Sequence, residues 1–180
     1  MTELLIRSAD FEISGDGRTL EGLAVPYDRP SQVSDKGGPR YWEEFDPHSA
    51  DNTIRLRSLR ALFVEHEHIR GSVGEVGFSQ SAEGTMFRAR MTDSVFATTT
   101  LARVNGGELP AVSIGFRALR SAKRSDPRGP VTRRLEVAID EMSLARVGQH
   151  AGAGVLQVRS EDDTPRLDDL RRRKMLLPLY

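Results

Sequence analysis

Alternating apolar and polar positions along the chain predict a protein built mainly from short β-strands. Successive side chains of a strand point to opposite faces, so a strand with one buried face shows a period of two. Segments with this pattern, or with short apolar runs between turn residues, recur along the chain. They are residues 3–7, 11–14, 19–27, 41–45, 59–66, 72–79, 85–91, 111–119, 131–147 and 155–158.

Turn-forming residues separate these segments. Residues 82–84, Ala-Glu-Gly, predict a hairpin between two neighbouring strands. Residues 28–40 are rich in Pro, Ser, Gly and Asp, and residues 120–130 in charged side chains, Gly and Pro. We expect both stretches to form surface loops.

Two segments carry helix signals. Asp46 followed by Pro47 is typical of a helix start, with Asp as the N-cap. A second helix is predicted to begin after Thr92 or Asp93 and to stop at residues 105–107, Asn-Gly-Gly.

This pattern favours a mainly β protein with helices, in the α+β class. A small β-barrel with a few helices packed around it accounts for the many short strands. A parallel α/β sheet is disfavoured because strands and helices do not alternate. The composition changes after Ser160. We therefore expect a barrel domain over residues 1–160 and a charged linker with a short helix over 161–180, which we interpret as a removable tail.

Composition excludes several classes of protein. Among the 180 residues, Lys plus Arg and Asp plus Glu both number 26, which argues against a general nucleic-acid binder. There is no cysteine, so disulfide scaffolds, thiol catalysis and cysteine-bound zinc are excluded. The first residues do not resemble a signal peptide, and no apolar run approaches the roughly 20 residues that a membrane span needs. A cytoplasmic setting is the expectation.

Ser113 lies in a predicted strand whose two faces differ. Val112, Ile114 and Phe116 share the face that we expect to be buried. Ser113 and Gly115 lie on the other face, where small residues leave room for another group to approach the hydroxyl. A serine so placed is either an ordinary strand residue or a nucleophile that requires a base.

His66 is the first candidate for that base. Leu62 and Val64 precede it on one face of the predicted strand, so His66 is expected to be partly shielded at the strand end. A histidine in that setting is suited to general base catalysis near neutral pH. A surface histidine at a strand edge is the alternative. His66 and His68 also have the spacing of metal ligands, although no third ligand is evident.

Glu141 is the candidate for the acid that orients the base. Val137 and Ile139 alternate on one face of the last long strand, whereas Met142 has the opposite parity. The change predicts a β-bulge near Asp140 and Glu141. Because Glu141 continues the earlier apolar face, we expect it to be partly buried and to need a partner such as a histidine N–H. A solvated acidic pair is the alternative.

Ser113, His66 and Glu141 are thus candidates for a nucleophile, a base and an acid. A triad is defined by geometry rather than by spacing, so the residues alone leave the assignment open. His68 is an alternative base if the strand register differs, and Ser143 is a competing nucleophile. Ser113 lacks the Gly-x-Ser-x-Gly elbow, which disfavours the α/β-hydrolases.

Five segments together are more specific. They are Gly22-Leu23-Ala24-Val25-Pro26-Tyr27-Asp28, Phe45-Asp46-Pro47-His48-Ser49-Ala50, Val64-Glu65-His66-Glu67 followed by Val73-Gly74, Ser113-Ile114-Gly115-Phe116, and Glu141-Met142-Ser143-Leu144. In order and spacing, residues 19–158 resemble the prohead maturation proteases of tailed bacteriophages, distant relatives of the herpesvirus assembly protease. The chain departs from the family pattern at flanking positions: Glu65 and Glu67 replace Asn and Asp, and His48 replaces glycine.

The resemblance implies a herpes-protease-like β-barrel and a serine endopeptidase. It assigns Ser113 as nucleophile, His66 as base and Glu141 as acid, and it points to Arg146 as the oxyanion-loop residue. The implied substrates are scaffold protein and the scaffold-like N-terminal segment of the major capsid protein, with the protease itself as a further one. Cleavage would take place inside the assembling prohead, in the host cytoplasm.

The remaining expectations concern partners and alternatives. No cofactor, metal, nucleic acid or membrane is implied, and a homodimer is one option because the herpesvirus relatives act as dimers. Two other functions stay open. One is a catalytically silent capsid-assembly or scaffold protein on the same fold, and the other is a metal hydrolase with histidine ligands.

Overall fold

The computed structural model describes residues 4–13, 17–35 and 38–146. The strand predicted over residues 155–158 and the tail predicted over residues 161–180 lie outside this part of the chain. The elements are β1 (Leu4–Ile13), β2 (Thr19–Pro26), β3 (Ser31–Val33), β4 (Tyr41–Phe45), α1 (Asp51–Leu56), β5 (Arg60–Val64), the 3-10 helix η1 (His68–Arg70), β6 (Gly74–Gln80), β7 (Gly84–Met91), α2 (Val95–Asn105), β8 (Ala111–Arg124) and β9 (Val131–Ala145).

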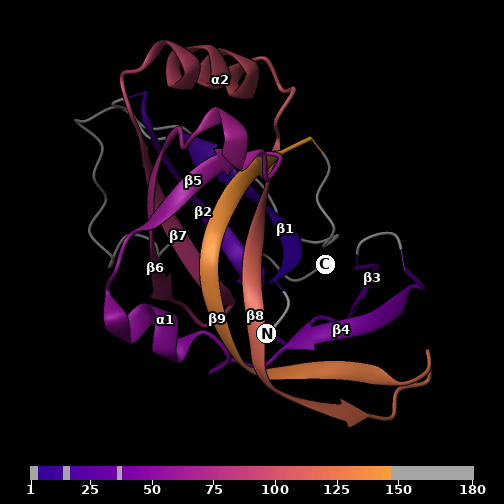
Figure 1. The fold of residues 1–180 in the computed structure, drawn as a ribbon. Coiled ribbons are helices and arrows are strands. Elements are labelled where there is room, and N and C mark those ends of the chain that lie inside the picture. Colours follow the sequence, from indigo (N-terminus) through magenta and orange to yellow (C-terminus); the bar gives the residue numbers. More distant parts are fainter. Residues whose placement is uncertain (1–3, 14–16, 36–37, 147–180) are drawn as a thin grey trace, which may run out of the picture.

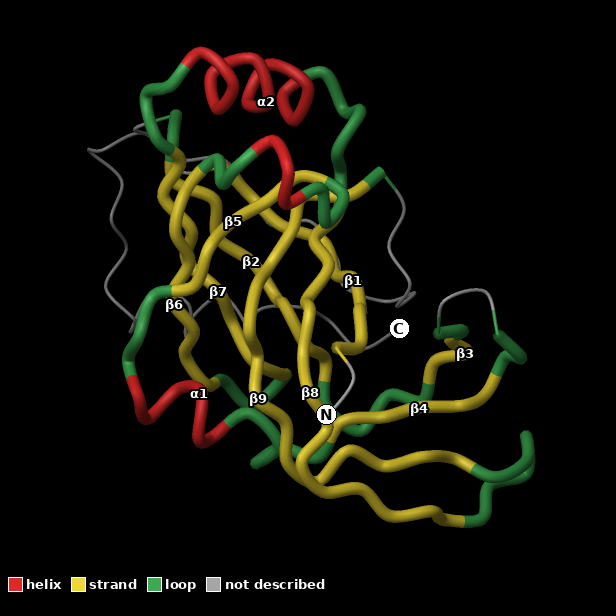
Figure 2. The backbone as a smooth tube through the Cα atoms, viewed as in Figure 1, coloured by secondary structure: helices red, strands yellow, loops and turns green. Residues whose placement is uncertain are grey.

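The strands form one sheet that curls on itself (Figures 1 and 2). Its order is β3-β4-β9-β5-β6-β7-β2-β1-β8, and β8 also pairs with β9. The long strand β9 is antiparallel to β8 but parallel to both β4 and β5. This mostly β arrangement with few helices agrees with the predicted α+β class and is compatible with a barrel. Its likeness to the herpesvirus protease stays a prediction.

The interior of the curled sheet holds the apolar core. Val112, Ile114 and Phe116 of β8 are fully buried, so the face that the alternation assigned to the core is confirmed. The ring of Phe116 meets that of Phe45 edge-on, with centroids 5.3 Å apart. Each such side chain contributes about 1.5–3 kcal/mol through removal from water. Other fully buried members of the core are Leu20, Leu62, Leu109, Ile139, Met142 and Leu144.

The strand β8 runs further than the sequence pattern predicts. Residues 120–124, which we expected in a loop, continue β8 and pair with β9 as far as Arg124 opposite Val131. This part of β8 lacks an apolar face and was therefore not recognised as a strand. Its Arg124 pairs with Glu44 of β4, and its Arg120 pairs with Glu136 of β9. Within the other predicted loop, residues 31–33 form the short strand β3 against β4.

Both helices begin later than predicted. The Ser94 hydroxyl accepts the Ala97 N–H at 3.1 Å and caps α2, in place of Thr92 or Asp93. The predicted stop after Asn105 is confirmed. Asp46 accepts the His48 N–H within a turn, and α1 starts only at residue 51.

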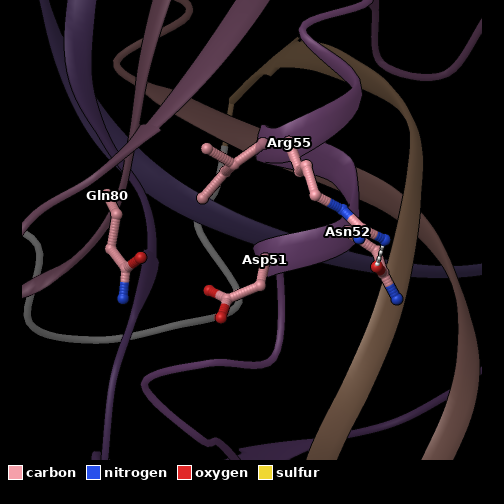
Figure 3. A pocket seen from close by; sticks show the side chains of 5 residues that line it. Asp51, Asn52, Arg55 and Gln80 are labelled. Carbon is pink, nitrogen blue, oxygen red and sulfur yellow. Dashed lines mark hydrogen bonds between the residues drawn. The ribbon is translucent and has the colours of Figure 1, made fainter.

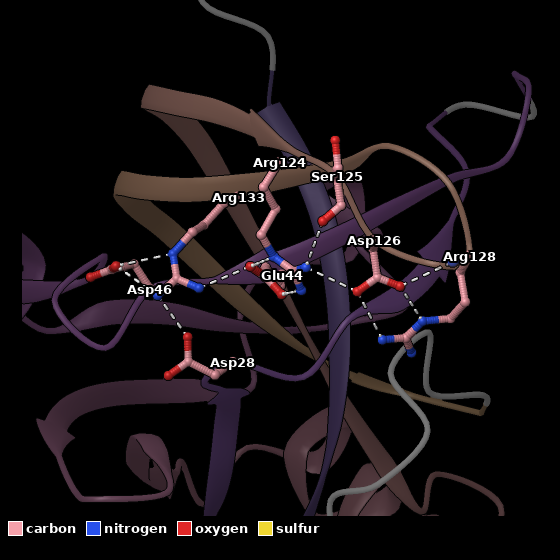
Figure 4. A network of polar contacts seen from close by, with 8 residues as sticks. All are labelled: Asp28, Glu44, Asp46, Arg124, Ser125, Asp126, Arg128 and Arg133. Atoms are coloured by element: carbon pink, nitrogen blue, oxygen red, sulfur yellow. Dashed lines mark hydrogen bonds and ion pairs between the residues drawn. The ribbon is translucent and has the colours of Figure 1, made fainter.

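A network of ion pairs ties the far end of the β8–β9 hairpin to β4 (Figure 4). Glu44 is 1% exposed. Its two oxygens accept hydrogen bonds from Arg124 at 2.6 Å and Arg133 at 2.9 Å. The hydrogen bonds from Arg124 and then Arg133 outweigh burial and hold the pKa of Glu44 below its usual range. Arg133 also binds Asp46, and Arg124 binds Asp126.

We predict that Glu44→Gln weakens the fold at neutral pH and removes part of its acid sensitivity. The pKa of Glu44 is lower in the folded chain, so its carboxylate stabilises the fold above about pH 4.5. That contribution is lost as the pH falls through the lower folded pKa. Denaturant titrations at pH 7 should show a loss of about 2 kcal/mol, as expected for hydrogen bonds to a charged group.

Glu21→Gln is the matched control for this prediction. Glu21 forms an exposed pair with Arg88, and such pairs contribute about 0–1 kcal/mol. Equal losses in the two variants at pH 7 would contradict a special role for the network around Glu44.

Candidate active site

The register of β8 against β9 places four residues of the candidate site on one face of the sheet. Ser113 lies opposite Ser143, and Gly115 lies opposite Glu141. Directly paired residues face the same side of a sheet. The residues between them, such as Ile114, belong to the core on the other side. The site therefore forms on the outer face of the curled sheet.

A bulge at Asp140 makes this register possible. Gly115 pairs with Glu141, but the next residue, Phe116, pairs with Ile139, so Asp140 has no partner in the ladder. The predicted bulge is thereby confirmed. Without the extra residue, Glu141 would share the core face of Ile139. The expectation that Glu141 continues that apolar face was wrong, and its 4% exposure has another cause.

The base candidate comes from a turn rather than from a strand. β5 ends at Val64, and Glu65 and His66 both have left-handed backbone conformations with φ of 49° and 60°. Such conformations cost about 1–3 kcal/mol each and persist where neighbours hold them. Here the Glu65 N–H donates to the Leu144 carbonyl at 2.9 Å, and the His66 N–H donates to the Ser143 hydroxyl at 3.1 Å. The alternation of side chains along β5 therefore does not determine where the His66 side chain points.

The turn brings His66 between Ser113 and Glu141. Its Nε2 lies 2.9 Å from Ser113 Oγ, and its Nδ1 lies 2.6 Å from Glu141 Oε1. When Nδ1–H donates to the carboxylate, Nε2 is left to accept the proton of the serine hydroxyl. The imidazole is 17% exposed and the carboxylate 6% exposed, so both are shielded from water. This arrangement can activate a hydroxyl nucleophile.

Gly115 provides the space that the Glu141 side chain fills. A Cβ atom at this position would lie 2.6 Å from Glu141 Cγ and 2.9 Å from its Oε1. The sequence pattern suggested that small residues here admit an approaching group. In the structure, the group beside Gly115 is the Glu141 side chain. Ser113 itself is also shielded, because it is only 1% exposed.

The other candidates occupy defined places around this centre. Ser143, the competing nucleophile, is fully buried and lies 3.3 Å from His66 Nδ1, on the side of the ring away from Ser113. His68, the alternative base, contacts the second oxygen of Glu141 through Nε2. Arg146 Nε lies 3.3 Å from Glu65 Oε1, beside the histidine turn. The part of the chain that the structure describes contains no group of three His, Cys, Asp or Glu side chains able to hold a metal ion.

An open hollow beside α1 is a separate feature (Figure 3). It is lined by Asp51, Asn52, Ile54, Arg55 and Gln80. The Arg55 guanidinium donates to the side-chain Oδ1 of Asn52 at 2.6 Å. None of the candidate residues lines it. In residues 4–13, 17–35 and 38–146, no helix is both long enough and apolar enough to cross a membrane.

Comparison with known families identifies the chain. A family model described as caudovirus prohead serine protease matches residues 2–164, so the chain belongs to that family. No curated protein and no solved structure gave a match. Membership confirms the resemblance to phage prohead proteases and indicates a serine protease of capsid maturation, acting on phage capsid proteins in the assembling capsid. The herpesvirus relationship stays a prediction.

We predict that Gly115→Ala slows proteolysis by displacing Glu141. A misplacement of about 1 Å in a catalytic array can cost roughly a hundredfold in rate. The rate of capsid-precursor cleavage should therefore fall by about that factor while circular dichroism shows an intact fold.

The control for this prediction is Gly77→Ala in β6. A Cβ atom there would meet Leu59 Cδ2 at 3.4 Å, an ordinary contact. The rate should be unchanged in this variant. Unchanged cleavage in Gly115→Ala would refute the packing argument.

Proposed function

We propose that this chain is a serine endopeptidase in which Ser113 is the nucleophile, His66 the base and Glu141 the acid. The observation that supports it is the continuous chain of contacts from Ser113 Oγ to His66 Nε2 at 2.9 Å and from His66 Nδ1 to Glu141 Oε1 at 2.6 Å. Three residues from three separate elements meet in the order that nucleophilic catalysis requires.

In the proposed reaction, Ser113 Oγ attacks the scissile carbonyl as His66 Nε2 takes its proton. His66 then returns the proton to the leaving amine, and water releases the acyl group by the reverse roles. Glu141 holds the imidazole in the tautomer with a proton on Nδ1 and stabilises the imidazolium. Its shielded position strengthens this interaction relative to water.

The oxyanion requires backbone N–H donors, each worth roughly a hundred- to a thousandfold in turnover. We assign Arg146, the residue that directly follows β9, to the oxyanion loop. The pairing of Arg146 with Glu65 supports this assignment, since it connects Arg146 to the turn that carries His66.

The proposed substrates are scaffold protein and the scaffold-like N-terminal segment of the major capsid protein, cleaved inside the prohead. Self-cleavage in the segment after residue 160 is a further proposal. These proposals follow from family membership together with the proposed triad.

We predict that Ser113→Ala abolishes cleavage of the capsid precursor without unfolding the chain. Loss of the serine of a triad costs roughly a millionfold in turnover. The measurement is mass mapping of capsid protein termini after co-expression with a phage major capsid protein.

The matched control is Ser58→Ala, because Ser58 is exposed and its hydroxyl contacts only a local carbonyl among the bonds described. That variant should process the precursor like the wild type. Mature capsid protein in the Ser113→Ala culture would show that Ser113 is not the nucleophile. Absence of processing by the wild type would instead favour a silent assembly role.

A further inference from the structure

One contact of Glu141 has no part in the proposed reaction. Glu141 presents two oxygens; His66 occupies Oε1, and His68 Nε2 contacts Oε2. The carboxylate is 6% exposed, whereas His68 is 55% exposed. A carboxylate so shielded needs a partner for each oxygen, because an unpaired one carries the cost of lost hydration.

The neighbouring acids have a different kind of partner. Three other acidic residues of the site region each face an arginine, at 3.3, 2.9 and 2.7 Å respectively. These pairs are Glu65 with Arg146, Glu67 with Arg70, and Asp140 with Arg117. Glu141 instead contacts two imidazoles. The arginine and histidine partners differ in charge, since a guanidinium is always ionised and an imidazole can be neutral.

A neutral donor has a specific advantage at Oε2. When neutral His68 donates its Nε2–H to Glu141, the carboxylate gains a hydrogen bond and keeps its full negative charge. An arginine in the same place would also satisfy the oxygen, but it would neutralise the charge that must stabilise the His66 imidazolium during the reaction.

Local structure holds His68 in this position. The His68 ring packs on that of Phe63, with centroids 4.6 Å apart and planes 36° from parallel. Phe63 pairs with Ser143 across the β5–β9 ladder, so it stands on the same outer face as the site. The His68 N–H donates to the His66 carbonyl at 3.1 Å, and the Gly71 N–H donates to the His68 carbonyl at 3.0 Å. The turn thereby fixes the two imidazoles relative to each other.

We infer that His68 is a positioning residue of the triad, whose Nε2–H donates to Glu141 Oε2, fixes the rotation of that carboxylate and so sets the tautomer of His66. This inference rests on the proposed function for its effect on catalysis, but not for its effect on His66.

Two substitutions separate the hydrogen bond from the bulk of the side chain. His68→Gln keeps an N–H donor near the place of Nε2, and His68→Leu removes it. His48→Leu is the matched control, because His48 is 74% exposed and pairs with Asp51 away from the site, at 3.1 Å. The full chain is used in every case.

Two measurements are made on each variant. The first is kcat and KM for cleavage of the purified capsid precursor. The second is the tautomer of His66, from ring-nitrogen chemical shifts of the ¹⁵N-labelled chain. A hydrogen bond to a charged group corresponds to a rate factor of roughly ten to a hundred. We expect His68→Leu to lose about that factor in kcat with little change in KM, and to show mixed His66 tautomers.

His68→Gln and His48→Leu should retain kcat and a single His66 tautomer with the proton on Nδ1. The inference is overturned if His68→Leu keeps that tautomer, or if His68→Gln is impaired as much as His68→Leu. If the wild type does not cleave the precursor, the proposed function fails, and the tautomer measurement alone then decides the role of His68.

Discussion

β8 and β9 pair so that Gly115 lies opposite Glu141. Just before that pair, Asp140 has no partner residue in the β8–β9 ladder, and this shifts the register by one residue. Core packing on one side and the polar site on the other both depend on this local ladder. With the shift, Ile139 packs into the interior of the curled sheet while Glu141 faces outward toward His66. Because a strand has a period of two, a shift of one residue is the smallest change that places Ile139 and Glu141 on opposite faces of the sheet.

Glu141 is then enclosed by its neighbours rather than by the core. Gly115 leaves room for its methylene groups, and two imidazoles meet its oxygens. The left-handed residues Glu65 and His66 allow the chain to leave β5 and turn back over the sheet. Their backbone strain is balanced by hydrogen bonds to Leu144 and Ser143, which belong to the same strand as Glu141. β9 thus positions both Glu141 and His66.

The sequence predicted most of the strands, the β6–β7 hairpin, the face of Ser113 and the bulge near Glu141. These features follow from short-range alternation and turn residues. It failed at residues 120–124, where charged side chains take the place of an apolar face and Arg124 pairs with Glu44. The sequence also did not predict the orientation of His66, because residues with left-handed backbone conformations cannot be recognised from the alternation of apolar positions. A histidine partner for Glu141 was expected, but its contacts with His68 and Gly115 were not, since both depend on the ladders that β9 forms with β5 and β8.

Activation of Ser113 by His66 is tested most directly by treatment of the chain with a fluorophosphonate, followed by peptide mapping of the adduct. We expect a phosphonylated Ser113 in the wild type and loss of that labelling in His66→Gln. An adduct on Ser143, or equal labelling of Ser113 in the two proteins, would contradict it.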